Sequence, residues 1–472
     1  MMKHRKSRAW PRSRAALLLC ALLPACALHH PKAPDAPAPP PQYKEAYALA
    51  DSQASTPDAW WTLFRDPVLD DLEQRLLIGN ENLKGSVAQV AVARALLRVS
   101  QGANEPTLGL NLSASRANAA TQPSAQIPLN TVSLGASSSW EIDVWGRLSA
   151  ATENAQASYD ASQADLAAAR LSAQATLAQT YFSLRTAEAQ GALQERSVQA
   201  YERALELTQA RYAGGLAGLS DVLQAQTQLG NARTQLSDTA AQRAQLEHAL
   251  AVLVGDAPAR FAVASTSALP DAVPVPASLP STLLQRRPDL RAAQRRVVAA
   301  YAQIGVADAA QLPALSLTAS AGFSQNSFAN LLNTPNVFWS LGSSLAQTIF
   351  DGNALAQASV QARANADLAM ANYRQQVLTA LQEVEDNLAL TSRLAEELQS
   401  QSAAVQAAQR NLDITLEQYR SGTVSYLNVV TAQTTAWTSE STLLTLRNRQ
   451  LSAVNVLLKN LAGRWDAEPA KP

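Results

Sequence analysis

The sequence is poor in the side chains on which most catalytic and metal sites depend. Its 472 residues include only two cysteines and four histidines, and both cysteines, Cys20 and Cys26, lie near the N-terminus. The body of the chain therefore has no disulfide and no thiolate metal site. Only His248 lies outside the N-terminal region, and a lone histidine offers little for acid–base or zinc chemistry. Since a phosphate-binding loop is also missing, we expect neither an enzyme nor a bound cofactor.

Basic charge is scarce outside the N-terminus. The whole chain has 38 basic and 38 acidic residues, but its first 25 residues hold six basic residues and no acidic one. The remainder thus carries 32 basic residues (38 minus 6) against 38 acidic ones, a net charge of −6. No basic face remains to neutralise phosphates, which argues against nucleic acid as a partner.

The N-terminus is typical of an exported protein. A basic segment over 1–14 and an apolar segment over 15–23 precede a small residue, which predicts a signal peptide over 1–25. The sequence Leu23-Pro24-Ala25-Cys26 resembles a bacterial lipobox, so we expect a covalent lipid on Cys26. The alternative is ordinary cleavage nearby, with Cys26 as an incidental thiol. Residues 26–58 contain a Pro-rich run and would form an extended, lipid-anchored tether.

Long apolar runs are absent from the rest of the chain. No later segment offers the roughly eighteen or more apolar residues of a spanning helix, so a membrane crossing would need strands. Alternation of apolar residues with Ser and Gly predicts such strands at 107–116, 131–140, 314–323 and 337–346. Aromatic residues gather at their ends, as in a membrane β-barrel. Four strands leave free edges in lipid, whereas a trimer would supply twelve. The alternative is a soluble hairpin on a helical core.

One stretch of sequence occurs twice. Arg211–Thr227 recurs 207 positions later as Gln418–Thr434, and each copy lies between Ala- and Gln-rich runs without proline. A glycine in such a run ends one helix, and the polar residues after it begin the next. Each copy is therefore predicted to be the turn of a long helical hairpin, and the constant offset indicates a tandem duplication. The two copies share Tyr212/Tyr419, Gly215/Gly422, Val222/Val429, Ala225/Ala432, Gln226/Gln433 and Thr227/Thr434.

These signals predict a mixed α/β membrane protein with an internal two-fold repeat. Helices of sixty-odd residues, about 90 Å long, would pair with shorter return helices as antiparallel coiled coils, forming a helical barrel continuous with the strands. A coiled-coil rod is the alternative, although rods do not carry strand pairs between their hairpins. The expected order is a first repeat over 59–255, a linker over 256–280, a second repeat over 281–463 and a tail over 464–472.

Several motifs together resemble one known family. They are the WWTLF sequence of Trp60–Phe64 with Asp66-Pro67 after it, RRPDLRAAQ at Arg286–Gln294, the paired Tyr-x-x-Gly turns, and Cys26. From Trp60 to about residue 463, the chain is similar to the TolC/OprM family of outer-membrane efflux channels, in its NodT-like lipoprotein branch. The branch usually has Glu where Gln294 stands, which is a minor departure.

The resemblance implies a homotrimer in the outer membrane of a Gram-negative bacterium. Its twelve-stranded barrel would join a long periplasmic helical barrel and form a passive exit duct for drugs or other toxic small molecules. Family members work with a periplasmic adaptor and an inner-membrane pump. Two alternatives remain at this stage: a conduit for type I protein secretion with the same architecture, and a periplasmic coiled-coil scaffold lipoprotein that forms no channel.

The resemblance also implies a gate just after the hairpin turns, which close the periplasmic end of the duct. Leu427 matches an apolar constriction, while Asn428 and Thr431 stand where relatives often have carboxylates. Asp221, the counterpart of Asn428 in the first repeat, is acidic and is expected to supply the gate's only acid. The plainer interpretations are that Leu427 is a packing residue and that Asp221 is an acid favoured by a helix N-terminus.

A latch is implied as well, because in relatives an Asp at the position of Asp221 bonds the tyrosine of the second turn. The expected pair here is Asp221 with Tyr419. Some members strengthen this latch with an arginine, but Val424 occupies that position. Closure is therefore expected to be weaker or differently held, with Tyr212 and Tyr419 packing the ends of their hairpins.

Overall fold

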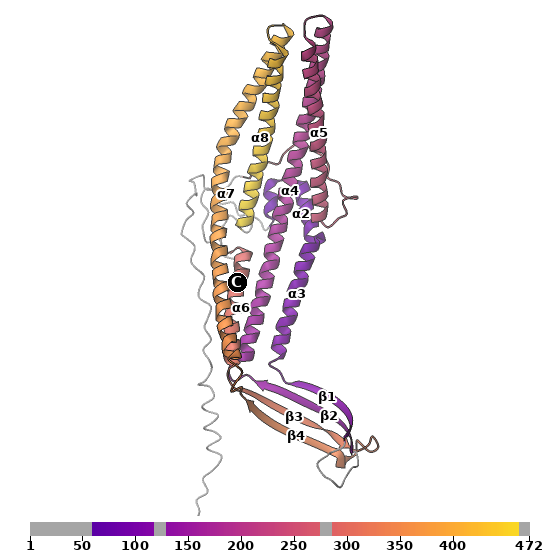
Figure 1. Cartoon of the computed structure of the whole chain (residues 1–472), viewed down its shortest axis with the longest axis vertical. Coiled ribbons are helices and arrows are strands. Elements are labelled where there is room, and N and C mark those ends of the chain that lie inside the picture. The colour runs from indigo at the N-terminus through magenta and orange to yellow at the C-terminus, as the bar shows by residue number, and fades with distance from the viewer. Residues whose placement is uncertain (1–58, 118–128, 274–285, 462–472) are drawn as a thin grey trace, which may run out of the picture. The chain divides into compact units, whose positions relative to one another are not determined.

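The computed structural model describes residues 59–117, 129–273 and 286–461 (Figure 1). Within those residues, none of the helices is long and apolar enough to cross a membrane. In chain order, the helices and strands are η2 (Trp60–Phe64), α2 (Pro67–Gly79), α3 (Glu81–Gly102), β1 (Thr107–Ala117), β2 (Leu129–Ile142), α4 (Arg147–Ala213), α5 (Leu219–Leu253), α6 (Pro288–Ala309), β3 (Ala314–Gln325), η4 (Thr334–Asn336), β4 (Val337–Ala346), α7 (Ala354–Arg420) and α8 (Tyr426–Asn460).

The chain forms two compact units, and neither coincides with one repeat. The strand unit takes its described residues from 89–163 and 292–374 and contains all four strands. The hairpin unit takes its described residues from 59–88, 164–291 and 375–461 and contains the hairpin turns. Each unit draws on both halves of the sequence because the long helices α4 and α7 run through both.

The strand unit is built on one antiparallel sheet in the order β1-β2-β3-β4 (Figure 1). Its hydroxyl face carries mainly Ser, Thr, Gly and Asn, with cross-strand hydrogen bonds between serine hydroxyls, such as 2.7 Å for Ser113–Ser133 and 2.8 Å for Ser320–Ser340. The opposite, apolar face is exposed, and Leu108 is 80% exposed there. Because side chains alternate along a strand, the sequence alternation produces these two unlike faces.

Two glycines allow the central strands to approach closely under an aromatic ring. Gly135 on β2 pairs with Gly322 on β3, which pairs with Phe338 on β4. A Cβ atom at Gly322 would lie 2.3 Å from the carbonyl oxygen of Leu134, and one at Gly135 would lie 3.2 Å from the Phe338 ring. The Phe338 ring therefore lies against Gly135, and Phe338 is the one aromatic side chain on the described hydroxyl face.

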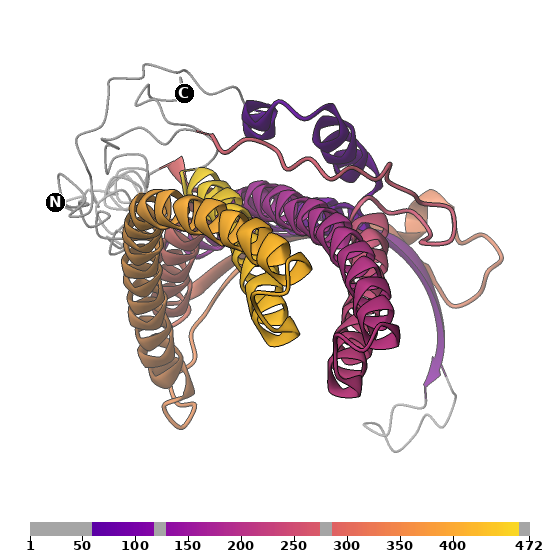
Figure 2. The same ribbon diagram turned by 90° about the horizontal axis from the view of Figure 1, so that it is seen from above.

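The two long hairpins have the same dimensions in both repeats. Helices α4 and α7 each have 67 residues, and their return helices α5 and α8 each have 35. In Figures 1 and 2, α4 runs beside α5 and α7 runs beside α8. An acidic side chain bonds the first turn of each long helix: Asp143 accepts from the amides of Leu148 and Ser149, and Asp351 accepts from that of Leu355. These hydrogen bonds begin both helices at equivalent places.

A large apolar core holds the hairpin unit together. Trp60 and Phe64 of η2 are buried against α4, and the ring centroids of Phe64 and Phe182 lie 4.8 Å apart. Asp66 accepts from the amide of Val68 at the start of α2 and from the Tyr181 hydroxyl at 2.5 Å. The WWTLF segment and the Asp-Pro after it thus attach η2 and α2 to α4, which explains why these residue types occur together.

We expect Gly322→Ala to destabilise the assembled protein by about 1–3 kcal/mol, because the added methyl group meets backbone rather than a movable side chain. The matched control is Gly109→Ala, since a Cβ there has its nearest neighbour 3.8 Å away. The temperature at which each purified variant unfolds in detergent measures the effect. Equal midpoints for the two variants would show that the close approach imposes no constraint.

The pH dependence of stability is expected to follow Glu73 on α2. Burial, with a smaller contribution from Asp70, raises the pKa of Glu73 from 4.5 to about 9, and neither carboxylate oxygen has a hydrogen-bond partner. The folded chain keeps this proton to higher pH than the unfolded chain, so stability falls as pH rises from about 5 to about 9. Glu73→Gln should flatten this slope in denaturant titrations at several pH values, whereas Glu81→Gln, at an exposed carboxylate, should leave it intact.

Candidate functional site at the hairpin turns

The two turns of the hairpin unit have equivalent backbone geometry. Gly215 and Gly422 adopt φ angles of 71° and 80°, a left-handed conformation that favours glycine. In the first turn the amide of Leu216 donates to the carbonyl of Arg211 at 2.8 Å, and in the second the amide of Thr423 donates to that of Gln418 at 2.9 Å. These bonds satisfy carbonyls that a helix end leaves free. The glycines of the repeated motif therefore end α4 and α7 in the same way.

Arg211 joins the end of the first hairpin to the end of the second. Its guanidinium carbon lies 4.6 Å from the centroid of the Tyr419 ring, and Nη1 donates to the Tyr419 carbonyl oxygen at 2.5 Å. Tyr419 belongs to the last turn of α7, where carbonyls lack partners and the helix dipole is negative. The cation therefore gains both a helix end and an aromatic face, and Tyr419 is left only 3% exposed.

A buried cluster surrounds this contact. It brings Tyr419 and Tyr426 together, with ring centroids 5.7 Å apart, and Ala225 of α5 packs in the same cluster. The hydroxyl of Tyr426 is buried and has no hydrogen-bond partner. Burial, with smaller contributions from Tyr419, Tyr201 and Asp221, raises the pKa of Tyr426 to about 12. The phenol stays neutral at physiological pH, so the cluster is uncharged apart from Arg211 and Asp221 at its margin.

The expected hydrogen bond between Asp221 and Tyr419 is not formed within this chain. Among the described residues, the Tyr419 hydroxyl instead lies 3.5 Å from the hydroxyl of Thr208 on α4. Asp221 is half-buried in the first turn of α5, and its negative charge contributes to the raised pKa of Tyr426. The reason is geometric: Arg211 holds the α7 end against α4, which directs the Tyr419 hydroxyl toward Thr208.

Three of the four predicted gate residues lie on one face of the first two turns of α8, and the fourth, Asp221, lies on α5. Leu427 is 57% exposed, and Asn428 and Thr431 are also exposed. The opposite side of the same turn is buried, including Tyr426 at 1% and Val429 at 0% exposure. All three side chains are therefore accessible from outside the chain, and more than half of the Leu427 side chain is uncovered.

Sequence reasoning did not identify Arg211 or Tyr426 as site residues. The absence of an arginine at Val424 suggested weak closure, but Arg211 supplies a cation from the other repeat. The available signal was an arginine in the last turn of a predicted helix, where it favours carbonyl oxygens. That signal does not reveal which helix end would be contacted.

A second polar network in the hairpin unit is structural. The buried side chains of Arg185 and Glu188 form an ion pair at 2.7 Å, and Glu188 also bonds Arg243 at 3.1 Å. Arg185 donates to the Tyr181 hydroxyl, while Glu188 accepts from the amide of Thr266. Burial raises the pKa of Tyr181, and no group of side chains in the described parts of the chain is arranged to hold a metal. The network attaches the extended segment after α5 to α4.

Comparison with known proteins agrees with this geometry. The family model described as "Outer membrane efflux protein" matches residues 72–256 and 279–463, one match for each repeat. The chain belongs to the outer membrane efflux protein family. It is 30% identical over 451 residues to the antibiotic efflux pump outer membrane protein ArpC of Pseudomonas putida, covering 92% of this chain and 91% of ArpC. It is also 30% identical over 460 residues to the pyoverdine export outer membrane protein OpmQ of Pseudomonas aeruginosa, covering 95% and 96%.

Solved structures of outer-membrane channels have the same fold. OprN matches with a TM-score of 0.85 at 27% identity, covering 92% of this chain and 99% of OprN. The open state of MtrE from Neisseria gonorrhoeae matches with a TM-score of 0.80 at 25% identity, covering 92% and 97%. The predicted family and architecture are thus confirmed. As a member of this family, the protein is an outer-membrane channel component of an efflux system and is not an enzyme.

We expect Arg211→Ala to loosen both hairpin ends, because it removes a stacked cation and a hydrogen bond to a helix end. A loss of about 1–2 kcal/mol in the free energy of local opening would speed amide exchange near Tyr419 and Tyr426 roughly tenfold. Hydrogen–deuterium exchange with mass spectrometry measures this. Arg203→Ala is the matched control, because Arg203 lies on the same helix and donates only to its own backbone at Gln199. Unchanged exchange in the Arg211 variant would mean that the contact does not hold the hairpins together.

Proposed function

We propose that three copies of this chain close their sheets into a twelve-stranded barrel that forms the exit of a passive duct. The observation that carries the proposal is the sheet itself: β1 and β4 are free edges, one face is apolar and exposed, and the other carries hydroxyls. Unpaired strand edges are not tolerated in lipid, whereas pairing β4 of one copy with β1 of the next removes them. The apolar face then meets lipid, and the hydroxyl face lines the lumen.

The hairpins of the three copies form the periplasmic tube of this duct, which receives cargo through a periplasmic adaptor from an inner-membrane pump. Small molecules are the proposed cargo, in keeping with the antibiotic and pyoverdine named for two relatives. Flow through the duct is passive and is driven by the pump. The proposed lipid on Cys26 and the signal peptide lie outside the described residues, and the Leu23–Cys26 sequence supports both.

The gate of the duct is the first turn of α8. Leu427, Asn428 and Thr431 share the exposed face that three copies would bring around one axis, and Asp221 supplies the retained acid from α5. Opening is a rotation of one hairpin against the other, which breaks the contact between Arg211 and Tyr419. A partner that binds the rotated state more tightly shifts the population toward it. This assigns to Arg211 the closing role that was expected of the Asp221–Tyr419 latch.

Single-channel conductance in a planar lipid bilayer tests the proposal. The wild-type protein should open rarely or with small conductance, and Leu427→Ala should raise conductance several-fold because the apolar constriction widens. Arg211→Ala should raise the frequency of opening instead. Ile414→Ala, at an exposed aliphatic residue of α7 outside the proposed gate, serves as the control. If correctly inserted protein never conducts in any variant, the duct is ruled out; if all variants conduct alike, the gate is misplaced.

A further inference from the structure

The hydroxyl face of the sheet carries one charged side chain. By register, Glu141 near the end of β2 lies on this face, because it pairs with Ser316, which in turn pairs with Ser344. The hydroxyls of those two serines are 2.8 Å apart, which confirms that both point the same way. Among the strand residues that the structure describes, every other side chain on this face is uncharged. Glu141 therefore determines the charge of this face unless a cation from another element neutralises it.

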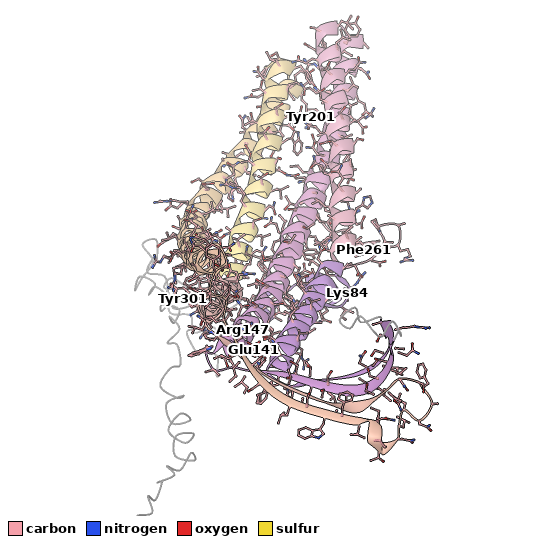
Figure 3. The ribbon with its side chains drawn as sticks, turned by 60° about the horizontal axis from the view of Figure 1, so that its bottom comes forward. Lys84, Glu141, Arg147, Tyr201, Phe261 and Tyr301 are labelled. Carbon is pink, nitrogen blue, oxygen red and sulfur yellow. The ribbon has the colours of Figure 1, made fainter. Side chains whose placement is uncertain are left out.

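Arg147 forms an ion pair with Glu141. Its Nη2 atom lies 2.8 Å from each carboxylate oxygen of Glu141, and its Nε atom lies 3.0 Å from one of them. The two side chains are 35% and 33% exposed, so the pair is accessible to water and to passing solutes (Figure 3). Such a two-point contact fixes the geometry as well as the charge balance. Both residues belong to the strand unit.

The position of Arg147 is unfavourable for a cation on its own. It is the first residue of α4, where the helix dipole is positive. Asp143 attracts Arg147 electrostatically, but its carboxylate accepts hydrogen bonds from the amides of Leu148 and Ser149. Arg147 therefore opposes a local rule of helix composition, and its compensating contact is Glu141. Positions that break such rules are often functional.

The second repeat is neutral at the equivalent place without any pair. Counting from the matched glycines Gly146 and Gly352, the counterparts of Glu141 and Arg147 are Gln347 and Asn353. The second repeat thus has no charged side chain at these two positions, whereas the first repeat has two opposite charges that form an ion pair. Other charges near this junction include the exposed Glu105, two residues before β1, and Asp143 and Asp351, each bonded to the start of a helix.

We propose that Arg147 sets the charge preference of the duct at the strand–helix junction, by neutralising Glu141 so that anionic solutes pass as well as cationic ones. The inference rests on the proposed duct, in which the hydroxyl face lines the lumen and three Glu141–Arg147 pairs surround it. Asp143 and Asp351 leave a modest preference for cations. Removing the Arg147 charge leaves Glu141 unpaired and increases the preference for cations. Removing the Glu141 charge leaves Arg147 unpaired and reduces or reverses that preference.

Reversal potentials across a bilayer with a KCl gradient test this inference. Arg147→Gln should raise the ratio of potassium to chloride permeability about twofold or more, and Glu141→Gln should lower it by a similar factor. The double variant, Glu141→Gln with Arg147→Gln, should return close to the wild type. Lys84→Gln is the control, since it also removes one exposed cation per chain, from the start of α3 in the hairpin unit.

A purely structural pair gives a different result. Both single variants would then change heat stability without opposite shifts in permeability ratio, and that outcome would overturn the inference. Arg147→Lys covers the case in which Arg147→Gln does not assemble: it keeps the charge but loses the two-point geometry, and it should keep wild-type selectivity. A changed ratio in Arg147→Lys counts against the inference. Absence of wild-type channels would instead refute the proposed function, and the inference with it.

Discussion

Unpaired backbone groups at the edges of a four-stranded sheet are the constraint on which the rest of this structure depends. One chain orders β1 to β4 but leaves both outer strands without partners, while its apolar face stays exposed. A sheet with one apolar face is stable when that face is covered, and within one chain most of this face is not. The sheet is therefore complete only when further copies extend it, and the helical hairpins must be placed so that they allow this.

The duplication explains how one sheet and two hairpins are combined. Each repeat contributes a strand pair followed by a 67-residue helix and a 35-residue return helix. Since β2 pairs with β3, the two repeats join through their strands. At the other end of the hairpins, Arg211 and Tyr419 join them again. The first junction is a continuous ladder of backbone hydrogen bonds. The second is made of side-chain contacts only: Arg211 on Tyr419, Thr208 beside the Tyr419 hydroxyl, and the small apolar cluster that includes Ala225.

Sequence patterns located the elements because their causes are local. Alternation of apolar and hydroxyl residues is a property of each strand, and a glycine within an Ala-rich run ends a helix wherever it occurs. The contact of Arg211 with Tyr419 spans 208 positions and depends on how two hairpins pack, which periodicity does not encode. The neutral buried carboxyl of Glu73 escaped notice for the same reason, because its surroundings come from several segments of the fold.

The departures from the expected pattern are the informative residues. Val424 stands where the family resemblance implied an arginine in some members, and in this structure the cation that contacts Tyr419 is Arg211, from the other repeat. Arg147 stands at a helix start that disfavours it, and its partner is the single charge on the hydroxyl face. In both cases an arginine from a helix end contacts an acceptor oxygen at close range. The first contact controls how firmly the hairpins are joined, and the second controls which charge is presented to the solute.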